Sequence, residues 1–406
     1  MSMDKPSTRP AYDIRNFGAV PNTTELQTQA IQAAIDTCSD NGGGEVRFPA
    51  GDYSSGQLFL KSKVTLYLEN GATLRNAPDP KGFRLVSESI DGSFRDKILE
   101  RHPFISARNA CDLVIKGDGC IDGGGENPGT WTDDQGRKIR PQLLSLQNCE
   151  RIKILGVRFC NARMWTLHLE GRRNCLVDGI SIENALVGEP HFHTNTDGID
   201  PDGCENMVIS NCRIRCNDDC VVIKSTTGRS SRNITVSNCI LTTDCYALKL
   251  GTESIGEFSN IQFSNCVIDG PGGGLFLSLR DGGSFRNILA SNLQIKSEGP
   301  YAIEVEIEPR REDIDFSKAA MEFIRFTNLN IETSKTMRFS GQETIPIRHV
   351  RLSDIMWIRK PGESTHVGHF SNVVDLNLDD VTIIDLPGTG PLPEPFQFQN
   401  CDKVSR

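Results

Sequence analysis

The chain has 406 residues, of which 37% are hydrophobic and 24% are charged, and its formal net charge at pH 7 is -9. No stretch approaches the roughly 18 consecutive apolar residues that a membrane span requires, so we expect a soluble protein without membrane association. The acidic balance argues against nucleic-acid binding, because neutralising phosphates requires clustered lysines and arginines, although it leaves room for a local basic cleft.

The N-terminal residues, MSMDKPSTRP, lack the apolar core of a secretory signal peptide. We therefore expect a cytoplasmic protein for the chain as it is written. A secreted or periplasmic location is expected instead if a signal has been trimmed from it.

Residues 25–40, ELQTQAIQAAIDTCSD, are predicted to form an amphipathic helix. Ile31, Ala34, Ile35 and Cys38 recur there at helical spacing, and three glycines follow the segment. Glycine is the commonest residue just beyond a helix, because it adopts the left-handed conformation without strain. The helix is therefore expected to end before residue 42.

Asn-Cys pairs recur along the chain at a nearly constant interval. Cys212 and Cys239 are 27 residues apart, Cys239 and Cys266 are also 27 apart, and Cys149 and Cys175 are 26 apart. A fixed period of this length is typical of a solenoid or a propeller. Because several of the 14 cysteines recur in this repetitive setting, we interpret most of them as small buried residues rather than disulfide partners or zinc ligands.

The content of each repeat favours a parallel β-helix. Units such as NITVSNCILTTDCYALKLG (233–251) hold two or three short β-rich runs bounded by Asn, Gly, Asp and Ser. A propeller blade needs four strands in about 40 to 45 residues, so the shorter period indicates a β-helix coil. Apolar positions such as Ile234, Val236 and Ile261 are expected to face inward, and the Asn of each turn is expected to stack on the one above.

The predicted fold is therefore an all-β, right-handed parallel β-helix that forms one domain over residues 1–406, with the helix at 25–40 capping its open end. Residues 77–102 and 307–346 break the period and carry Pro, Gly and charge. They are predicted to be long loops or irregular coils that wall a groove.

The densest polar cluster lies in residues 191–225. Asp197 precedes Asp218 by 21 residues and Asp219 by 22, which is roughly one coil, so the two segments should lie side by side about 4.8 Å apart. Such a cluster suits an inverting glycosidase, which needs an acid and a base with carboxyl groups about 6.5 to 9.5 Å apart. Crowding also raises the proton affinity of carboxylates, so that one can serve as the acid.

NTDGID (195–200), followed one coil later by NDDC (217–220), resembles the polygalacturonase family of glycoside hydrolases. Further segments resemble pectin-acting β-helices: FGAV (17–20), AIQAAID (30–36), GGGEVRFPAGDY (42–53), GDGCIDGGG (117–125), Trp131 and MWTLH (164–168). The resemblance implies that Asp218 is the general acid and that Asp197 and Asp219 hold the attacking water. Asp200 fits a supporting carboxylate.

The chain departs from that family on the next two coils. The family's Gly-His-Gly corresponds to Asp244-Cys245-Tyr246, and its Arg-Ile-Lys, which binds the substrate carboxylate, corresponds to Phe276-Leu277-Ser278. Binding of the galacturonate carboxylate is therefore expected either to be lost or to depend on other residues. Lys224, Lys249 and Arg280 lie on successive coils and are candidates for a rebuilt cationic site.

Other polar and aromatic residues near the motif are candidate substrate contacts. His191 and His193 are expected to face the same way on a strand, although two ligands without a third do not make a metal site. The remaining candidates are Asn195, Trp165, which either stacks under a sugar or packs in the interior, and His168. We expect no cofactor and no metal.

Three functions remain open. The first is an inverting glycoside hydrolase acting on a poly- or oligosaccharide, with exo action favoured because the loops at 77–102 and 307–346 are suited to closing a groove. The second is a polysaccharide lyase or epimerase, against which the absence of a basic partner beside the aspartates argues. The third is a non-catalytic carbohydrate-binding β-helix, favoured by the loss of the histidine and Arg-Ile-Lys.

Overall fold

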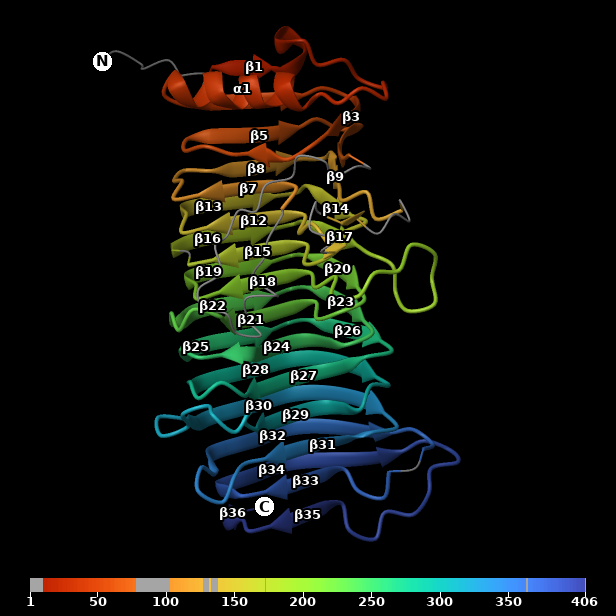
Figure 1. Cartoon of the computed structure of the whole chain (residues 1–406). Helices are drawn as coiled ribbons and strands as arrows, with labels where there is room; N and C mark the ends of the chain where they lie inside the picture. The colour runs from red at the N-terminus through yellow and green to blue at the C-terminus, as the bar shows by residue number, and fades with distance from the viewer. Residues whose placement is uncertain are drawn as a thin grey trace, which may run out of the picture.

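The computed structural model describes residues 10–77, 103–126, 131–132, 138–171, 173–362 and 364–405. The chain winds into one continuous stack of parallel strands, with the N-terminal coils at one end and the C-terminal coils at the other (Figure 1). This is the right-handed parallel β-helix that the repeat predicted.

One long face of the stack is a 12-stranded parallel sheet. Its strands, in their order along the stack, are β4 (Leu58–Phe59), β7 (Ile105–Arg108), β12 (Leu144–Gln147), β15 (Leu167–Glu170), β18 (Ile199–Asp202), β21 (Val221–Ser225), β24 (Tyr246–Ser254), β27 (Gly273–Leu279), β29 (Tyr301–Ile307), β31 (Thr336–Ser340), β33 (Gly368–Ser371) and β35 (Phe396–Gln399).

The other faces belong to a 22-stranded sheet. One series of its strands is β1 (Ala11–Asp13), β2 (Gly44–Phe48), β5 (Val64–Leu68), β8 (Val114–Gly117), β13 (Glu150–Leu155), β16 (Arg173–Asp178), β19 (Glu205–Ser210), β22 (Ser231–Ser237), β25 (Glu257–Ser264), β28 (Ser284–Ser297), β30 (Ala320–Thr333), β32 (Ile347–Arg359), β34 (Val373–Asp385) and β36 (Asp402–Ser405). The second series is β3 (Gly51–Ser55), β6 (Ala72–Asn76), β9 (Cys120–Asp122), β14 (Arg158–Cys160), β17 (Ser181–Glu183), β20 (Arg213–Cys216), β23 (Ile240–Thr243) and β26 (Val267–Gly270), and it merges with the first at β28. A separate hairpin joins β10 (Trp131–Thr132) to β11 (Lys138–Ile139).

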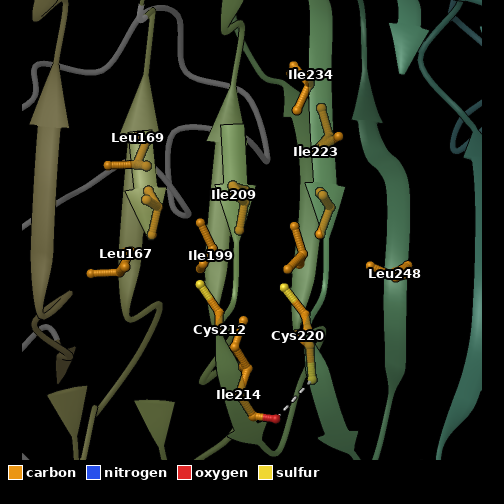
Figure 2. Packing of buried hydrophobic residues seen from close by; sticks show 14 of the residues in the cluster. Leu167, Leu169, Ile199, Ile209, Cys212, Ile214, Cys220, Ile223, Ile234 and Leu248 are labelled. Carbon is orange, nitrogen blue, oxygen red and sulfur yellow. Dashed lines mark hydrogen bonds between the residues drawn. The ribbon is translucent and has the colours of Figure 1, made fainter. Parts of the chain in front are cut away.

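The core fills the space between the sheets. Successive side chains of a strand point to opposite faces, so the alternating apolar residues of every coil meet inside. Ile234, Val236 and Ile261 are buried as predicted. Figure 2 shows part of this core, with Ile199 and Cys212 among the packed side chains.

Asparagines stack along the corners of the coils, as the repeat predicted. Asn238 Nδ2 donates to Asn211 Oδ1 at 3.3 Å, and Asn292 Nδ2 donates to Asn265 Oδ1 at 2.9 Å. All four have positive φ, which asparagine tolerates better than most residues. Each row of stacked asparagines therefore stabilises the turns of successive coils, and it also provides hydrogen-bond partners for the side-chain amides.

None of the 14 cysteines is joined in a disulfide, and most are buried. The thiols of the repeat face inward, where they donate to backbone carbonyls. Cys212 Sγ lies 3.1 Å from the carbonyl oxygen of Ser210, and Cys239 Sγ lies 3.3 Å from that of Ser237. The interpretation of these cysteines as small core residues is confirmed.

The predicted helix is α1 (Thr28–Asp40), preceded by the short 3₁₀ helix η1 (Ile14–Phe17). It lies at the N-terminal end of the stack (Figure 1) and buries Ile31, Ala34, Ile35 and Cys38. Its start is three residues later than the predicted boundary at 25. Among the described residues, no helix has both the length and the apolar character that a membrane crossing needs.

The prediction of an irregular segment over 307–346 is wrong for most of its length. Strands β30 and β31 are regular, and the interruption is confined to residues 308–319. The ladder resumes with Asn328 Nδ2 donating to Asn292 Oδ1 at 2.8 Å across 36 residues. The inserted residues displace the period without breaking the coil, which concealed the repeat in the sequence. The other segment predicted to be irregular, 77–102, lies outside the described residues except at its first position.

Candidate active site

The three predicted aspartates come together beside the 12-stranded sheet. Asp197 precedes β18 and Asp219 precedes β21, and the backbone pairs them: Gly198 N donates to the Asp219 carbonyl oxygen at 2.9 Å. Asp197 and Asp219 are buried, whereas Asp218 is partly exposed. Asp218 is therefore the member of the cluster that solvent reaches.

Asp218 lies in a small network that reaches an unpredicted arginine. Asn195 Nδ2 donates to Asp218 Oδ2 at 3.3 Å, and Arg140 Nη1 donates to Asn195 Oδ1 at 3.1 Å. Arg140 also donates to the carbonyl oxygen of Thr194. Burial lowers the pKa of Arg140, and the charges of Asp197 and Asp218 oppose that shift. Arg140 is thus a cation held close to the cluster.

Lys224 is buried among three carboxyl groups. Its Nζ lies 3.6 Å from Asp197 Oδ2, 3.5 Å from Asp200 Oδ1 and 3.3 Å from Glu253 Oε2. Burial alone would lower the pKa of Lys224, but these carboxylates raise it well above its usual value. The lysine therefore stays charged.

Asp197 and Asp200 form a carboxyl pair beneath that lysine. Burial and the neighbouring carboxyl groups raise the pKa of Asp197 well above its usual value. Burial also raises the pKa of Asp200 to about 8, although the charge of Lys224 opposes that shift. The pair consequently retains a proton near neutral pH.

Asp219 is oriented by the next coil. Lys249 Nζ lies 2.8 Å from Asp219 Oδ2, and the Tyr246 backbone N–H donates to Asp219 Oδ1 at 3.2 Å. Burial alone would lower the pKa of Lys249, but Asp219 raises it above its usual value. Phe276 follows on the adjacent strand, with its ring 5.4 Å from Lys249 Nζ.

Lys224 and Lys249 join the cluster, but the third predicted cation does not. Arg280 Nε donates to Glu306 Oε1 at 2.9 Å, and its Nη2 lies 2.9 Å from Glu308 Oε2. Ser278 Oγ also donates to Glu306 Oε1, at 3.1 Å. Carboxylates of later coils therefore hold Arg280, and its role as a substrate-binding cation stays a prediction.

Trp165 and His168 lie beneath the site. Trp165 is only 4% exposed, and Lys224 Nζ sits 4.7 Å from its ring centre. His168 is fully buried, with Nε2 3.1 Å from Asp202 Oδ2. Trp165 therefore follows the interior-packing alternative, and the expectation that His168 contacts substrate is not met, because its neighbours enclose it.

The two histidines before the motif are not on a strand. His191 has a positive φ of 65° and sits in a turn, so the strand on which the two side chains were expected to face the same way is not present. His193 Nε2 lies 2.8 Å from the Gly125 carbonyl oxygen, and burial lowers its pKa. Turn residues break the alternation on which the expectation rested.

A possible metal-ligand group arises instead from Asp218, Asp219 and Cys245, whose candidate ligand atoms lie within 4.8 Å of one another. Burial raises the pKa of the Cys245 thiol above its usual value. Because a thiol binds metal as the thiolate, this shift opposes its use as a ligand.

Sequence reasoning missed Arg140, Glu253 and Arg310. Glu253 bridges Lys224 and Arg310, whose Nη1 lies 3.2 Å from Glu253 Oε1. Burial alone would raise the pKa of Glu253, but these two cations lower it to about 2. Glu253 follows Lys224 by about one repeat, which was a usable signal. The sequence held no such signal for Arg140 and Arg310, because they lie in irregular segments outside the repeat.

Comparison with known proteins finds polygalacturonases among the relatives of this chain. Two of the most similar curated relatives are a probable polygalacturonase of Vitis vinifera, 36% identical over 220 residues (52% of this chain, 43% of the relative), and an endo-polygalacturonase of Pectobacterium carotovorum subsp. carotovorum, 30% identical over 224 residues (51% and 54%). The chain thus spans about half the length of the curated relatives that it matches.

Solved structures share the fold. An exopolygalacturonase from Thermotoga maritima superposes with a TM-score of 0.78 at 21% identity, covering 93% of this chain and 92% of that one. A family 28 exopolygalacturonase of Yersinia enterocolitica gives a TM-score of 0.74 at 21% identity, covering 98% and 78%. Residues 38–275, more than half of the chain, match the sequence model described as "Glycosyl hydrolases family 28". The chain therefore belongs to glycosyl hydrolases family 28, as the resemblance of its aspartate motifs predicted.

Proposed function

We propose that this protein hydrolyses glycosidic bonds in a pectin-like polysaccharide or oligosaccharide by an inverting mechanism. The observation that carries the proposal is the convergence of Asp197, Asp218 and Asp219 on adjoining coils of a family 28 chain. Two carboxyl groups acting as acid and base are the chemical requirement for glycoside hydrolysis.

Asp218 is the proposed general acid. A general acid must come within hydrogen-bonding reach of the leaving oxygen, and Asp218 is the partly exposed member of the three. Its Oδ2 accepts from Asn195, which Arg140 holds in turn. This chain of contacts supports a fixed orientation of the carboxyl group toward the substrate.

Asp219 and Asp197 are the proposed partners of the attacking water. Lys249 and the Tyr246 amide hold both oxygens of Asp219. The pKa values of both members of the buried carboxyl pair are raised, so the pair shares a proton near neutral pH. We propose that this proton lies on Asp200 when the water attacks. This leaves Asp197 able to accept the proton of the water while Lys224 balances its charge.

The substrate unit near Phe276 is proposed to be held differently from galacturonate. The ring of Tyr246 packs 4.6 Å from that of Phe276, and Ser278 is bonded to Glu306. Lys249, whose Nζ lies 5.4 Å from the Phe276 ring, is already paired with Asp219. Arg280, which donates to Ser278 Oγ at 3.2 Å, is paired with Glu306. A carboxylate at this point would compete with Asp219, so we propose that galacturonan is not the preferred substrate.

The structure changes the argument against a lyase. The expectation that no basic residue lies beside the aspartates is wrong, since Lys224 and Lys249 both do. A lysine that abstracts a proton must first be neutral, and the neighbouring carboxylates raise the pKa of both. These charged lysines support hydrolysis over elimination.

Exo action remains part of the proposal. Arg310, in the insertion after β29, contacts Glu253 and thereby lies near the cluster. Its position supports a role for this insertion in closing the groove. A product profile dominated by one small sugar from the first time points would support exo action, and a ladder of intermediate lengths would contradict it.

The test is a substrate screen on the wild type and on Asp218→Asn. Galacturonan, rhamnogalacturonan and neutral glycans are incubated with protein, and new reducing ends are measured. NMR of the first product distinguishes inversion from retention at the anomeric carbon. Loss of the acid should lower kcat by about 100- to 10,000-fold.

Asp269→Asn is the matched control, because Asp269 is an exposed carboxylate on β26. It should leave turnover unchanged. Full activity of Asp218→Asn would refute the acid assignment, and an unsaturated, ultraviolet-absorbing product would show a lyase. Binding without turnover of any glycan would favour the non-catalytic alternative.

A further inference from the structure

A second carbohydrate site is indicated where an asparagine ladder stops. On the 22-stranded sheet, Asn206, Asn233, Asn260 and Asn287 stack at one corner of successive coils. Their amide groups hydrogen-bond in series at 2.9, 3.0 and 2.7 Å. Each residue has a positive φ near 55°, so this corner requires the left-handed conformation on every coil.

Phe323 occupies that corner on the next coil. The pairings of Arg286 with Glu322 and of Ile288 with Ile324 place it directly after Asn287. Its φ is 58°, which is strained for a bulky residue and easily adopted by asparagine. Its side chain is also 51% exposed. A strained, exposed aromatic residue in place of asparagine indicates a role other than stabilising the fold.

The exposed ring is part of a rigid platform. His349, at the same corner of the following coil, stacks on Phe323 with ring centres 4.8 Å apart and planes 8° apart. His349 Nδ1 lies 2.6 Å from Asp375 Oδ2. This contact fixes the imidazole and engages the one carboxylate of the group.

Two arginines flank the platform. Arg325 and Arg351 are register partners on β30 and β32, and both are exposed. Neither forms an ion pair with any described residue, although like charges on neighbouring strands repel. Phe323, His349 and both arginines line a hollow of about 550 Å³. An acidic protein thus carries an uncompensated cationic pair beside an exposed ring.

We propose that this hollow binds a polyuronate chain, at a site separate from the aspartate cluster. Guanidinium groups bind carboxylates through paired, charge-assisted hydrogen bonds. The Phe323 ring offers an apolar face to the C–H side of a pyranose ring. The combination fits an acidic sugar polymer better than a neutral one.

Such a site would increase capture of a polymeric substrate in which uronate stretches accompany the differently held unit near Phe276. The hollow lies on the 22-stranded sheet, whereas the aspartates adjoin the 12-stranded sheet. A chain bound at the hollow raises the effective concentration of its other segments at the protein surface. Short oligosaccharides, which occupy one site at a time, gain nothing from it.

The decisive variant is Phe323→Asn, because it restores the residue that the fold uses at this corner. Binding is measured in an Asp218→Asn background by affinity electrophoresis in gels containing polygalacturonate. We expect about ten-fold weaker binding, the scale of losing one aromatic anchor. The variant should unfold at the same temperature as the parent or a higher one, so that the loss cannot be attributed to misfolding.

Arg351→Gln should weaken binding in the same assay, and Arg213→Gln is its matched control. Arg213 is exposed on β20 and forms no ion pair among the described residues. Unchanged polygalacturonate binding in Phe323→Asn would overturn the proposal. Equal losses on a neutral glycan, or equally tight binding of dextran sulfate, would overturn the polyuronate assignment. A concentration-dependent dimer that Phe323→Asn abolishes would show a self-association surface instead.

These measurements do not depend on hydrolysis, because the parent already lacks the proposed acid. Failure of the proposed function therefore leaves the binding result interpretable. In the active protein, Phe323→Asn should slow turnover of an acidic polymer and leave turnover of a short oligosaccharide unchanged.

Discussion

Lys224 is the residue whose removal should most clearly reveal the electrostatics of the site. In Lys224→Met, a side chain of similar length replaces a cation that is 5% exposed and lies within 3.6 Å of three carboxyl groups. Removing one partner from a buried ion pair typically costs about 3 to 5 kcal/mol, because the remaining charge is left uncompensated. Glu253 retains Arg310, so the cost should fall mainly on Asp197 and Asp200.

The pH dependence follows from the direction of the pKa shifts. Both aspartates already have raised pKa values, and loss of Lys224 raises them further. A carboxyl group whose folded pKa is above its unfolded value contributes stability that is complete below the unfolded pKa and is lost as pH rises through the folded pKa. The destabilisation of Lys224→Met should therefore be small near pH 4 and grow toward pH 9.

Urea unfolding at a series of pH values measures this difference. Lys296→Met is the control, because Lys296 is exposed and lies 3.7 Å from Asp269, an arrangement worth at most about 1 kcal/mol. A penalty for Lys224→Met that is equal at pH 5 and pH 9 would refute the electrostatic account. It would show instead that the aliphatic chain of Lys224 stabilises the fold by packing on Trp165.

Three further outcomes are expected. In Asp200→Asn, the fall in unfolding free energy as pH rises through about 8 should be smaller than in the wild type, and a parallel pair of pH–stability curves would contradict the assigned pKa. Leu248→Ala, at a fully buried core position, should lower the free energy of unfolding in urea by about 2 to 5 kcal/mol. Ile240→Ala, at a residue that is 41% exposed, should lower it much less. Similar losses in both variants would disprove the assignment of Leu248 to the interior. Phe276→Arg should raise kcat/KM on oligogalacturonides relative to neutral oligosaccharides, and an unchanged ratio would show that Phe276 does not set the preference.

The repeat could be recognised in the sequence because successive coils of a solenoid meet the same local structural requirements. Several coils place asparagine at a left-handed corner and a small buried cysteine directly after it, so pairs such as Asn211-Cys212 and Asn238-Cys239 recur with the coil. The insertion at 308–319 hid the same rule, since period analysis fails when residues are added between coils. The regular strand β30 was missed for that reason.

The β-helix, the capping helix and the grouping of Asp197, Asp218 and Asp219 could be predicted from the sequence, because residues one repeat apart must lie on neighbouring coils. The aspartate motifs also indicated the family. Tertiary structure decided which side chains meet across them. Lys224 and Lys249 joined the aspartates while Arg280 went to Glu306, and Arg140 entered from a segment outside the repeat. Such pairings depend on side-chain direction, burial and competition among charges, and none of these is periodic in the sequence.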